Sequence, residues 1–233
     1  MFSKSAAIYD AVYSFKDYAA ESDRLRELID RAAPGSRTLL DVACGTGKHL
    51  ERLREWYDVC GIDLDPGLLH IARERLGDVE LHLADMTDFE LGRRFDVVTC
   101  LFSSIGYVGT VARLDDAIAA MAAHLNPGGV LILEPWLTPD DWVAGRPHLL
   151  SVDEADLKIA RMTISSREGR LSIMDFEYLV GTSAGIETFS ERHAPALFTD
   201  EEYRKAFAST RLSAEHDPVG LIGRGLYIGR PGD

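Results

Sequence analysis

The 233-residue sequence is short of basic charge, poor in cysteine and free of long apolar runs. Its 25 Lys and Arg residues stand against 38 Asp and Glu residues, which gives a formal charge of −13 at pH 7. A non-specific nucleic-acid binder needs a basic surface, so that class is excluded. The uncharged stretch at residues 97–112 contains serines and glycines and is too short to span a bilayer. We therefore expect no nucleic-acid and no membrane partner.

The three cysteines, Cys44, Cys60 and Cys100, all lie in apolar contexts. An odd, low number without C-x-x-C spacing argues against a disulfide framework and against a zinc site, so we predict no metal. Cysteines of this kind are typical of small buried side chains in a reducing compartment. Residues 1–13 lack the apolar core of a signal peptide. These features predict a soluble, cytoplasmic protein.

Short apolar strands alternate with helical patterns through the first 135 residues. Strand signals lie at residues 37–43, 58–63, 79–83, 95–102 and 130–134, and helical spacing at residues 21–33, 49–57, 66–76 and 114–125. Such alternation is typical of an α/β fold, in which a parallel sheet carries helices on both faces. We predict a Rossmann-like sheet.

The pattern changes after Pro135. Residues 157–165 and 171–180 are β-rich and flank a hairpin signal, and residues 186–198 resemble another strand. A capping box then opens a helix at residues 199–208, and residues 225–229 form a last strand. We predict three parts, listed by their bounds: an α/β domain with an N-terminal lid segment over residues 1–135, an antiparallel β insertion after the fifth strand over residues 136–197, and a return to the core sheet over residues 198–233.

A glycine-rich turn between the first strand and the next helix carries the first functional signal. Asp41-Val-Ala-Cys-Gly45-Thr-Gly47 lets the backbone approach a ligand, and the helix N-terminus offers free N–H groups. The turn is not a dinucleotide motif, because Leu50 stands where the last glycine belongs. Lys48 is not followed by Ser or Thr, so it is not a P-loop either.

Acidic residues follow the next two strands. Asp63 ends the second strand, where a carboxylate accepts hydrogen bonds from two ribose hydroxyls. Asp85 and Met86 follow the third strand, where the acid suits an adenine amino group and the thioether covers a ring. Together these residues predict a nucleoside site without a pyrophosphate, which fits S-adenosylmethionine.

The segments LLDVACGTGKHL, GIDLDP, ADM and LNPGGVLILEP, in this order and spacing, resemble the class I S-adenosylmethionine-dependent methyltransferases over residues 37–135. The resemblance implies that S-adenosyl-L-methionine is the cofactor. The residues that it implies as cofactor-binding are Tyr18, Asp41, Ala43, Gly45, Gly47, Asp63, Leu64, Asp85, Met86 and Leu101.

A narrower resemblance runs over nearly the whole chain. The segments IYDAVY, KDYAAE, DMTDFELGRRFD, FSSIGYV, HLNPGGVLILEPW, SSREG, LFTDEEYRKAF and GRGLYIG resemble the nucleotide-linked amino-sugar N,N-dimethyltransferases of antibiotic biosynthesis. The resemblance implies a thymidine diphosphate (TDP)-linked amino-deoxyhexose as substrate, a homodimer and no metal. Residues 14–16 are shorter and less rich in Gly and Arg than the family segment, and Leu137 replaces a family Trp. These departures leave the particular amino sugar open.

The resemblance places a Tyr or a His close to the amine, at the carboxyl end of the fourth strand, and here that residue is Tyr107. We predict Tyr107 as the catalytic residue, with water or bulk solvent as alternative proton acceptors. Basic side chains at residues 158–170, and Arg224 between two glycines, suit a diphosphate. The residues that we predict to contact the substrate are Tyr9, Trp136, Ser165, Ser166, Arg167, Arg170, His193 and Arg224.

Two other functions remain open from the sequence. An N-methyltransferase of a small amine or amino acid, such as glycine, shares this fold and a similar FSSIG-like loop. Glycine has no diphosphate to neutralise, so the basic hairpin separates the two enzymes. A non-catalytic nucleoside-binding protein is the third possibility, and the intact acids Asp63 and Asp85 argue against it.

Overall fold

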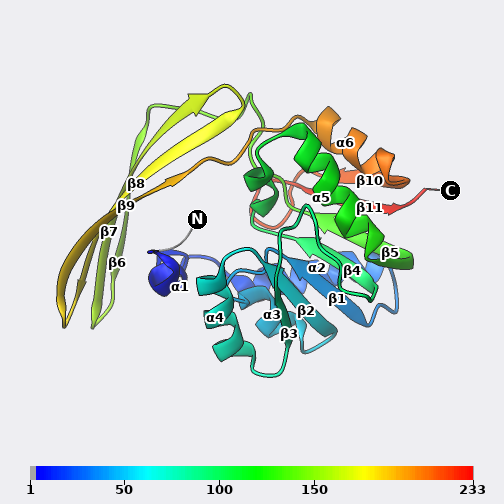
Figure 1. The fold of residues 1–233 in the computed structure, drawn as a ribbon, viewed down its shortest axis with the longest axis horizontal. Coiled ribbons are helices and arrows are strands. Elements are labelled where there is room, and N and C mark those ends of the chain that lie inside the picture. The colour runs from blue at the N-terminus through cyan, green and yellow to red at the C-terminus, as the bar shows by residue number, and fades with distance from the viewer. Residues whose placement is uncertain (1–3, 233) are drawn as a thin grey trace.

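The structure, a computed structural model, describes residues 4–232 and contains two β-sheets (Figure 1). The helices are α1 (Tyr9–Val12), α2 (Tyr18–Ala32), α3 (Lys48–Leu53), α4 (Pro66–Leu76), α5 (Val111–Ala123) and α6 (Asp200–Ser209), with short 3-10 turns η1 (Ala6–Ile8) and η2 (Ser104–Val108). The strands are β1 (Thr38–Val42), β2 (Asp58–Asp63), β3 (Glu80–Leu83), β4 (Phe95–Cys100), β5 (Leu125–Leu133), β6 (Pro147–Asp153), β7 (Leu157–Glu168), β8 (Leu171–Thr182), β9 (Gly185–His193), β10 (Leu212–Asp217) and β11 (Leu226–Pro231). Every helix within residues 4–232 is too short or too polar to cross a membrane.

The larger sheet has seven strands in the order β10-β11-β5-β4-β1-β2-β3. Strands β1 to β5 run parallel, and β11 pairs antiparallel with both β5 and β10. One apolar cluster packs α2, α3 and α4 against one face, and another packs α5 and α6 against the other face. The predicted Rossmann-like sheet with helices on both faces is confirmed.

The core alternates along each strand because successive side chains point to opposite faces. On β1, Leu39 joins the cluster under α2, and Leu40 joins the cluster under α5. Both are fully buried, and burial of one such side chain contributes about 1.5–3 kcal/mol. The unbroken apolar runs of the central strands follow from this burial on both sides.

The second sheet is antiparallel, in the order β6-β7-β8-β9, and falls within the predicted insertion. It stands apart from the core, and the N-terminal helix α1 lies between them (Figure 1). Val12 of α1 packs against Ile159 and Phe176 on the inner face of this sheet. The insertion is thereby joined to the core through the N-terminal segment.

Sequence patterning does not reveal every strand. Strands β6 and β10 lie at sheet edges, where one side is solvent and the apolar signal is weak. Strand β9 ends at His193, earlier than the predicted residue 198. Strand β5 begins at Leu125, the last residue of the predicted helix, and runs through the turn expected before residue 130.

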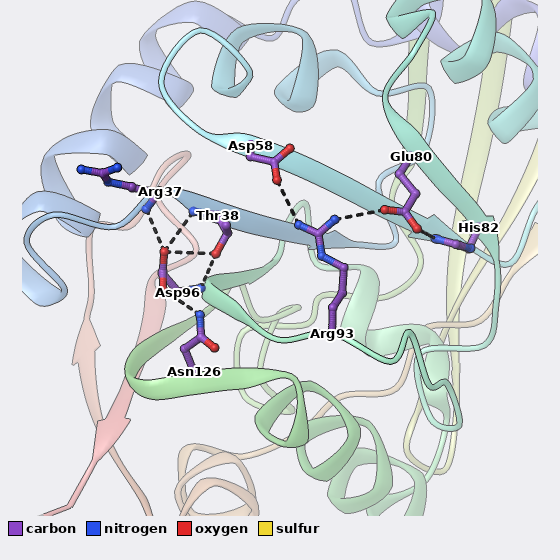
Figure 2. Close-up of polar contacts among 8 residues, drawn as sticks. All are labelled: Arg37, Thr38, Asp58, Glu80, His82, Arg93, Asp96 and Asn126. Atoms are coloured by element: carbon purple, nitrogen blue, oxygen red, sulfur yellow. Dashed lines mark hydrogen bonds and ion pairs between the residues drawn. The ribbon is translucent and has the colours of Figure 1, made fainter.

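Polar contacts hold the amino ends of the parallel strands (Figure 2). The Asp96 Oδ2 atom accepts hydrogen bonds from the backbone N–H groups of Arg37 and Thr38, at 2.8 Å and 3.0 Å. Its Oδ1 atom accepts a bond from the Asn126 side chain at 2.8 Å. This carboxylate therefore joins β4 to the start of β1. The carboxyl ends of the strands lie at the opposite edge of the sheet.

Candidate active site

A cavity of about 1120 Å³ lies at the carboxyl ends of the parallel strands, the edge at which open α/β sheets bind ligands. Its walls come from the N-terminal segment, the ends of β1, β2 and β4, the inner face of the second sheet and the loop before β11. A smaller cavity of about 40 Å³ adjoins it. The residues that line both cavities are Tyr9, Ala43, Gly45, Phe102 and Ser104.

The glycine turn after β1 needs its glycines for two different reasons. Gly45 has a φ of +58°, and a Cβ there would meet no atom within 4 Å. The Gly45 backbone therefore lines the cavity with no side chain over it. Gly47 has a φ of +77° and lines neither cavity. A Cβ on Gly47 would lie 2.7 Å from Leu76 Cδ1, so this glycine lets α3 pack against α4.

Asp63 sits at the end of β2 and faces the large cavity. Its carboxylate accepts backbone N–H groups from Gly45 and Asp65, each at 2.8 Å. Burial raises the pKa of Asp63, and these hydrogen bonds oppose the rise. Each oxygen keeps a second lone pair for a hydroxyl donor, which is what a ribose diol requires.

Asp85, Met86 and Leu64 form the next part of the same wall. Burial raises the pKa of Asp85, but hydrogen bonds from Thr87 and Arg113 outweigh it and hold the value below the usual one. Arg113 Nη2 donates to Asp85 Oδ2 at 2.9 Å. Arg113 also lines the cavity, and it was not predicted because nothing in the sequence of its helix distinguishes it from a surface cation.

The lining of the smaller cavity includes Tyr18, Asp41 and Leu101, as well as the residues shared with the large one. Thr99 Oγ1 donates to Asp41 at 2.8 Å, and burial raises the pKa of Asp41 to about 6. Tyr18 contributes a phenol whose pKa burial also raises. The two cavities therefore meet at the glycine turn, where both are lined by Ala43 and Gly45.

A buried ion cluster that the sequence did not predict lies beside this cavity. Glu21 lies between Lys16 Nζ and His49 Nε2, each at 2.8 Å. Burial raises the pKa of Glu21, but both partners lower it, and the net shift is downward. Lys16 also lies 4.1 Å from the centre of the Phe102 ring. The segment KDYAAE contains Lys16 and Glu21, and it is the signal that could have identified them.

The loop after β4 is held in an unusual backbone conformation. Phe102 and Ser103 have φ values of 51° and 60°, a left-handed region that costs energy for residues other than glycine. The Phe102 N–H donates to the buried Glu134 carboxylate at 2.6 Å, and the Ser103 hydroxyl donates to the Pro135 carbonyl at 2.6 Å. Contacts from the end of β5 thus fix the loop that presents Tyr107.

The large cavity also contains Tyr9, Tyr107, Trp136, His193 and Arg224. Tyr107 and His193 form a hydrogen bond of 2.7 Å. Arg224 donates to Ser103 Oγ at 3.1 Å, and its guanidinium lies 4.7 Å from the Trp136 ring centre. Burial lowers the pKa of Arg224.

The hairpin residues lie elsewhere. Arg170 pairs with Glu202 at 2.8 Å, and Arg167 donates to backbone carbonyls within and beside the hairpin. Ser165 is buried, Ser166 is exposed, and none of the four lines either cavity. Their contact with a substrate stays a prediction.

Arg161 supplies a cation to the cavity from β7, on the core side of the hairpin. Its guanidinium lies 4.7 Å from the centre of the Phe176 ring. The Nε and Nη1 atoms are buried and have no hydrogen-bond partner within residues 4–232. Arg161 belongs to the basic stretch at residues 158–170, but the sequence alone does not reveal which of those cations faces a ligand.

Cys60, Glu80 and His82 bring their possible ligand atoms within 4.8 Å of one another, outside both cavities. Sequence spacing does not reveal this group, because β2 supplies Cys60 and β3 supplies the other two. Glu80 already contacts His82 at 2.8 Å and Arg93 at 3.1 Å (Figure 2). Arg93 thus neutralises the carboxylate without a metal ion, and the prediction of no metal is unchanged.

Comparisons with known proteins agree with this geometry. The family described as "Methyltransferase domain" matches residues 39–129. The dTDP-3-amino-3,6-dideoxy-alpha-D-glucopyranose N,N-dimethyltransferase of Streptomyces fradiae is 44% identical, covering 97% of this chain and 91% of that protein.

Two solved structures extend the comparison. DesVI of Streptomyces venezuelae has a TM-score of 0.94 at 40% identity, covering 97% of this chain and 98% of its own. CalS10, an amino pentose methyltransferase from Micromonospora echinaspora solved with S-adenosylmethionine bound, has a TM-score of 0.89 at 42% identity, covering 97% of each chain. The chain therefore belongs to the S-adenosylmethionine-dependent N,N-dimethyltransferases of nucleotide-linked amino sugars.

Proposed function

We propose that this protein transfers two methyl groups in succession to the amino group of a TDP-linked amino-deoxysugar, as a cytoplasmic homodimer in antibiotic biosynthesis. The observation that carries the substrate class is Arg161, a cation that lines the cavity and whose buried Nε and Nη1 donors have no hydrogen-bond partner within residues 4–232. Buried donors cost free energy when unsatisfied, and a phosphate oxygen satisfies them.

The residues at the strand ends fit S-adenosylmethionine. Asp63 suits the ribose hydroxyls, Asp85 and Met86 suit the adenine, and the open side of Gly45 admits a ligand against the backbone. When bound, the cofactor supplies a methyl group on a sulfonium, a good leaving group that needs no covalent help. The protein's own task is to hold the amine in line and exclude water.

A second cation supports a diphosphate over a small amino acid. Arg224 joins Arg161 in lining the cavity, and each guanidinium lies 4.7 Å from the centre of an aromatic ring. A diphosphate brings about two negative charges to a chain of net charge −13. Cations beside the diphosphate must therefore offset its repulsion by the negative charge of the protein. Glycine, the substrate of the alternative enzyme, would leave these guanidiniums without a phosphate.

The outer face of the second sheet supports the homodimer. Leu149, Met162, Ile164 and Leu179 are each roughly half exposed or more on neighbouring strands. An apolar strip of this kind in a soluble protein marks an interaction surface. The inner face of the same sheet lines the cavity, so one sheet would serve both the substrate and the partner copy.

The test is a methyl-transfer assay with a TDP-3-amino-deoxyhexose and, separately, with glycine. Mass spectrometry of early time points should show a gain of one methyl before two, because one cofactor site must exchange its spent cofactor between transfers. Turnover of glycine alone would favour the small-amine enzyme. A product that stops at one methyl with excess cofactor would contradict the dimethyltransferase assignment.

A further inference from the structure

Tyr107, His193 and Glu191 lie in a row at the large cavity, where the second sheet forms its wall. The Tyr107 hydroxyl and His193 Nδ1 lie 2.7 Å apart, and His193 Nε2 lies 3.6 Å from Glu191 Oε2. Glu191 and His193 are 8% and 2% exposed, whereas Tyr107 and His193 both line the cavity. The line therefore runs from the ligand space into the protein interior.

The groups around His193 determine which of its two ring nitrogens carries the proton. Glu191 of the same strand faces Nε2, so that nitrogen carries the proton and Nδ1 accepts from the Tyr107 O–H. Within residues 4–232, Arg161 of β7 and Tyr107 of η2 are further ionisable groups near the ring. Burial lowers the pKa of His193, and Glu191 opposes that shift. The resting imidazole is thus neutral and able to accept a proton.

The N-terminal segment holds the Glu191 carboxylate. The backbone N–H groups of Lys4 and Ser5 each donate to Oε1 at 3.1 Å, and the Ser5 hydroxyl donates to Oε2 at 2.6 Å. Tyr9 of the same segment lines both cavities. The segment that covers the ligand space therefore also orients the carboxylate behind His193.

Two successive N-methylations require a proton acceptor. After the first transfer the nitrogen is a secondary ammonium, and it has no lone pair until a proton leaves. This inference rests on the proposed function. We propose that Tyr107, His193 and Glu191 form a proton-transfer chain that removes this proton from the amine, with Glu191 as the positioning residue.

The N–H bond of the ammonium breaks and its proton binds Tyr107 Oη, while the proton of Tyr107 moves to His193 Nδ1. The electron pair stays on nitrogen and becomes the lone pair that attacks the methyl group. The imidazolium is then paired with the Glu191 carboxylate, and it returns its proton to solvent when the site opens.

The experiment compares the pH dependence of kcat in His193→Ala, Glu191→Gln and the wild type. We expect His193→Ala to lower kcat roughly a hundredfold and to move the acidic limb of the profile to higher pH, with S-adenosylhomocysteine affinity within about twofold. Added imidazole should restore part of kcat. Glu191→Gln removes the carboxylate that raises the pKa of His193, so it should move the same limb to lower pH, with a smaller loss of kcat. The matched controls are His70→Ala and Glu187→Gln, both exposed and outside the cavity, and their profiles should overlay the wild type.

Tyr107→Phe removes a single oxygen, so it keeps the proposal testable if His193→Ala fails to fold. It should reproduce the shifted limb, without rescue by imidazole. Profiles that overlay the wild type in Tyr107→Phe and in any folded His193 variant would overturn the chain and leave the proposed function standing. A loss of kcat with no shift and no rescue would also overturn it, because that pattern is structural damage. If the wild type methylates no amino-sugar nucleotide, the proposed function fails, and the inference fails with it.

Discussion

The backbone N–H of Gly45 donates a hydrogen bond of 2.8 Å to the carboxylate of Asp63. Strand β2 thereby fixes the turn that follows β1, although 18 residues separate the two groups. The same carboxylate lines the cavity. Asp63 thus shapes the glycine turn and supplies an acceptor to the ligand.

Asp63→Ala should weaken the binding of S-adenosylhomocysteine at least tenfold. The lost hydrogen bonds to a charged group correspond to about 1.5–3 kcal/mol. Titration calorimetry measures the affinity, and Asp78→Ala, at a highly exposed position, is the control. If Asp63→Ala binds S-adenosylhomocysteine with unchanged affinity, the ribose hydroxyls do not bind at Asp63.

Arg224→Met should raise the KM for the sugar nucleotide roughly tenfold to a hundredfold, about 1.4–2.7 kcal/mol. The substitution keeps most of the apolar stem on Trp136 and removes the charge that would meet the diphosphate. Steady-state kinetics checks it beside Arg230→Met, which alters an exposed pair with Glu215. If sugar-nucleotide binding is normal and the cofactor is lost, the assignment of Arg224 is wrong.

The hydrogen bonds that Asp96 accepts should make the free energy of unfolding depend on pH. Burial raises the pKa of Asp96, but bonds from Arg37, Asn126 and Thr38 outweigh it and hold the value below the usual one. The carboxylate therefore stabilises the fold above the unfolded value of about 3.9, and this contribution is lost as pH falls through the lower folded value.

Asp96→Asn should accordingly lower the free energy of unfolding at pH 7 by about 1–3 kcal/mol, and the difference should shrink in acid. Urea unfolding at several pH values measures this. Asp140→Asn, at an exposed position, should change little at any pH. If the difference in the free energy of unfolding between Asp96→Asn and the wild type stays constant down to acidic pH, the ionised Asp96 carboxylate does not stabilise the fold in this way.

Met162→Asp combined with Ile164→Asp should convert a dimer into a monomer. Both side chains project from the outer face of β7, where a buried charge in an apolar interface would cost several kcal/mol. Sedimentation measures the mass, and Val219→Asp, exposed but outside that sheet, should leave it unchanged. A monomeric wild type would refute the proposed interface.

The second sheet shows where sequence reasoning stops. Alternation along β7 puts Arg161 at the cavity, but a shift of one residue in register would turn it outward. Arg170 has the same basic character and is instead satisfied by Glu202, 32 residues away. Composition identifies a basic hairpin, and only the pairing register decides which cation meets the ligand space.

The sequence by itself determined the parallel α/β core and the gathering of acidic side chains at the carboxyl ends of its strands. Asp41, Asp63 and Asp85 each end or follow a strand closely, and neighbouring parallel strands end at one edge of the sheet. Such local spacing is enough to bring them together. Only the tertiary structure decided the contact between Tyr107 and His193, which are 86 residues apart, and the placement of Glu191 behind them. Those contacts depend on how the second sheet and the N-terminal segment pack over the core, and no local pattern encodes that packing.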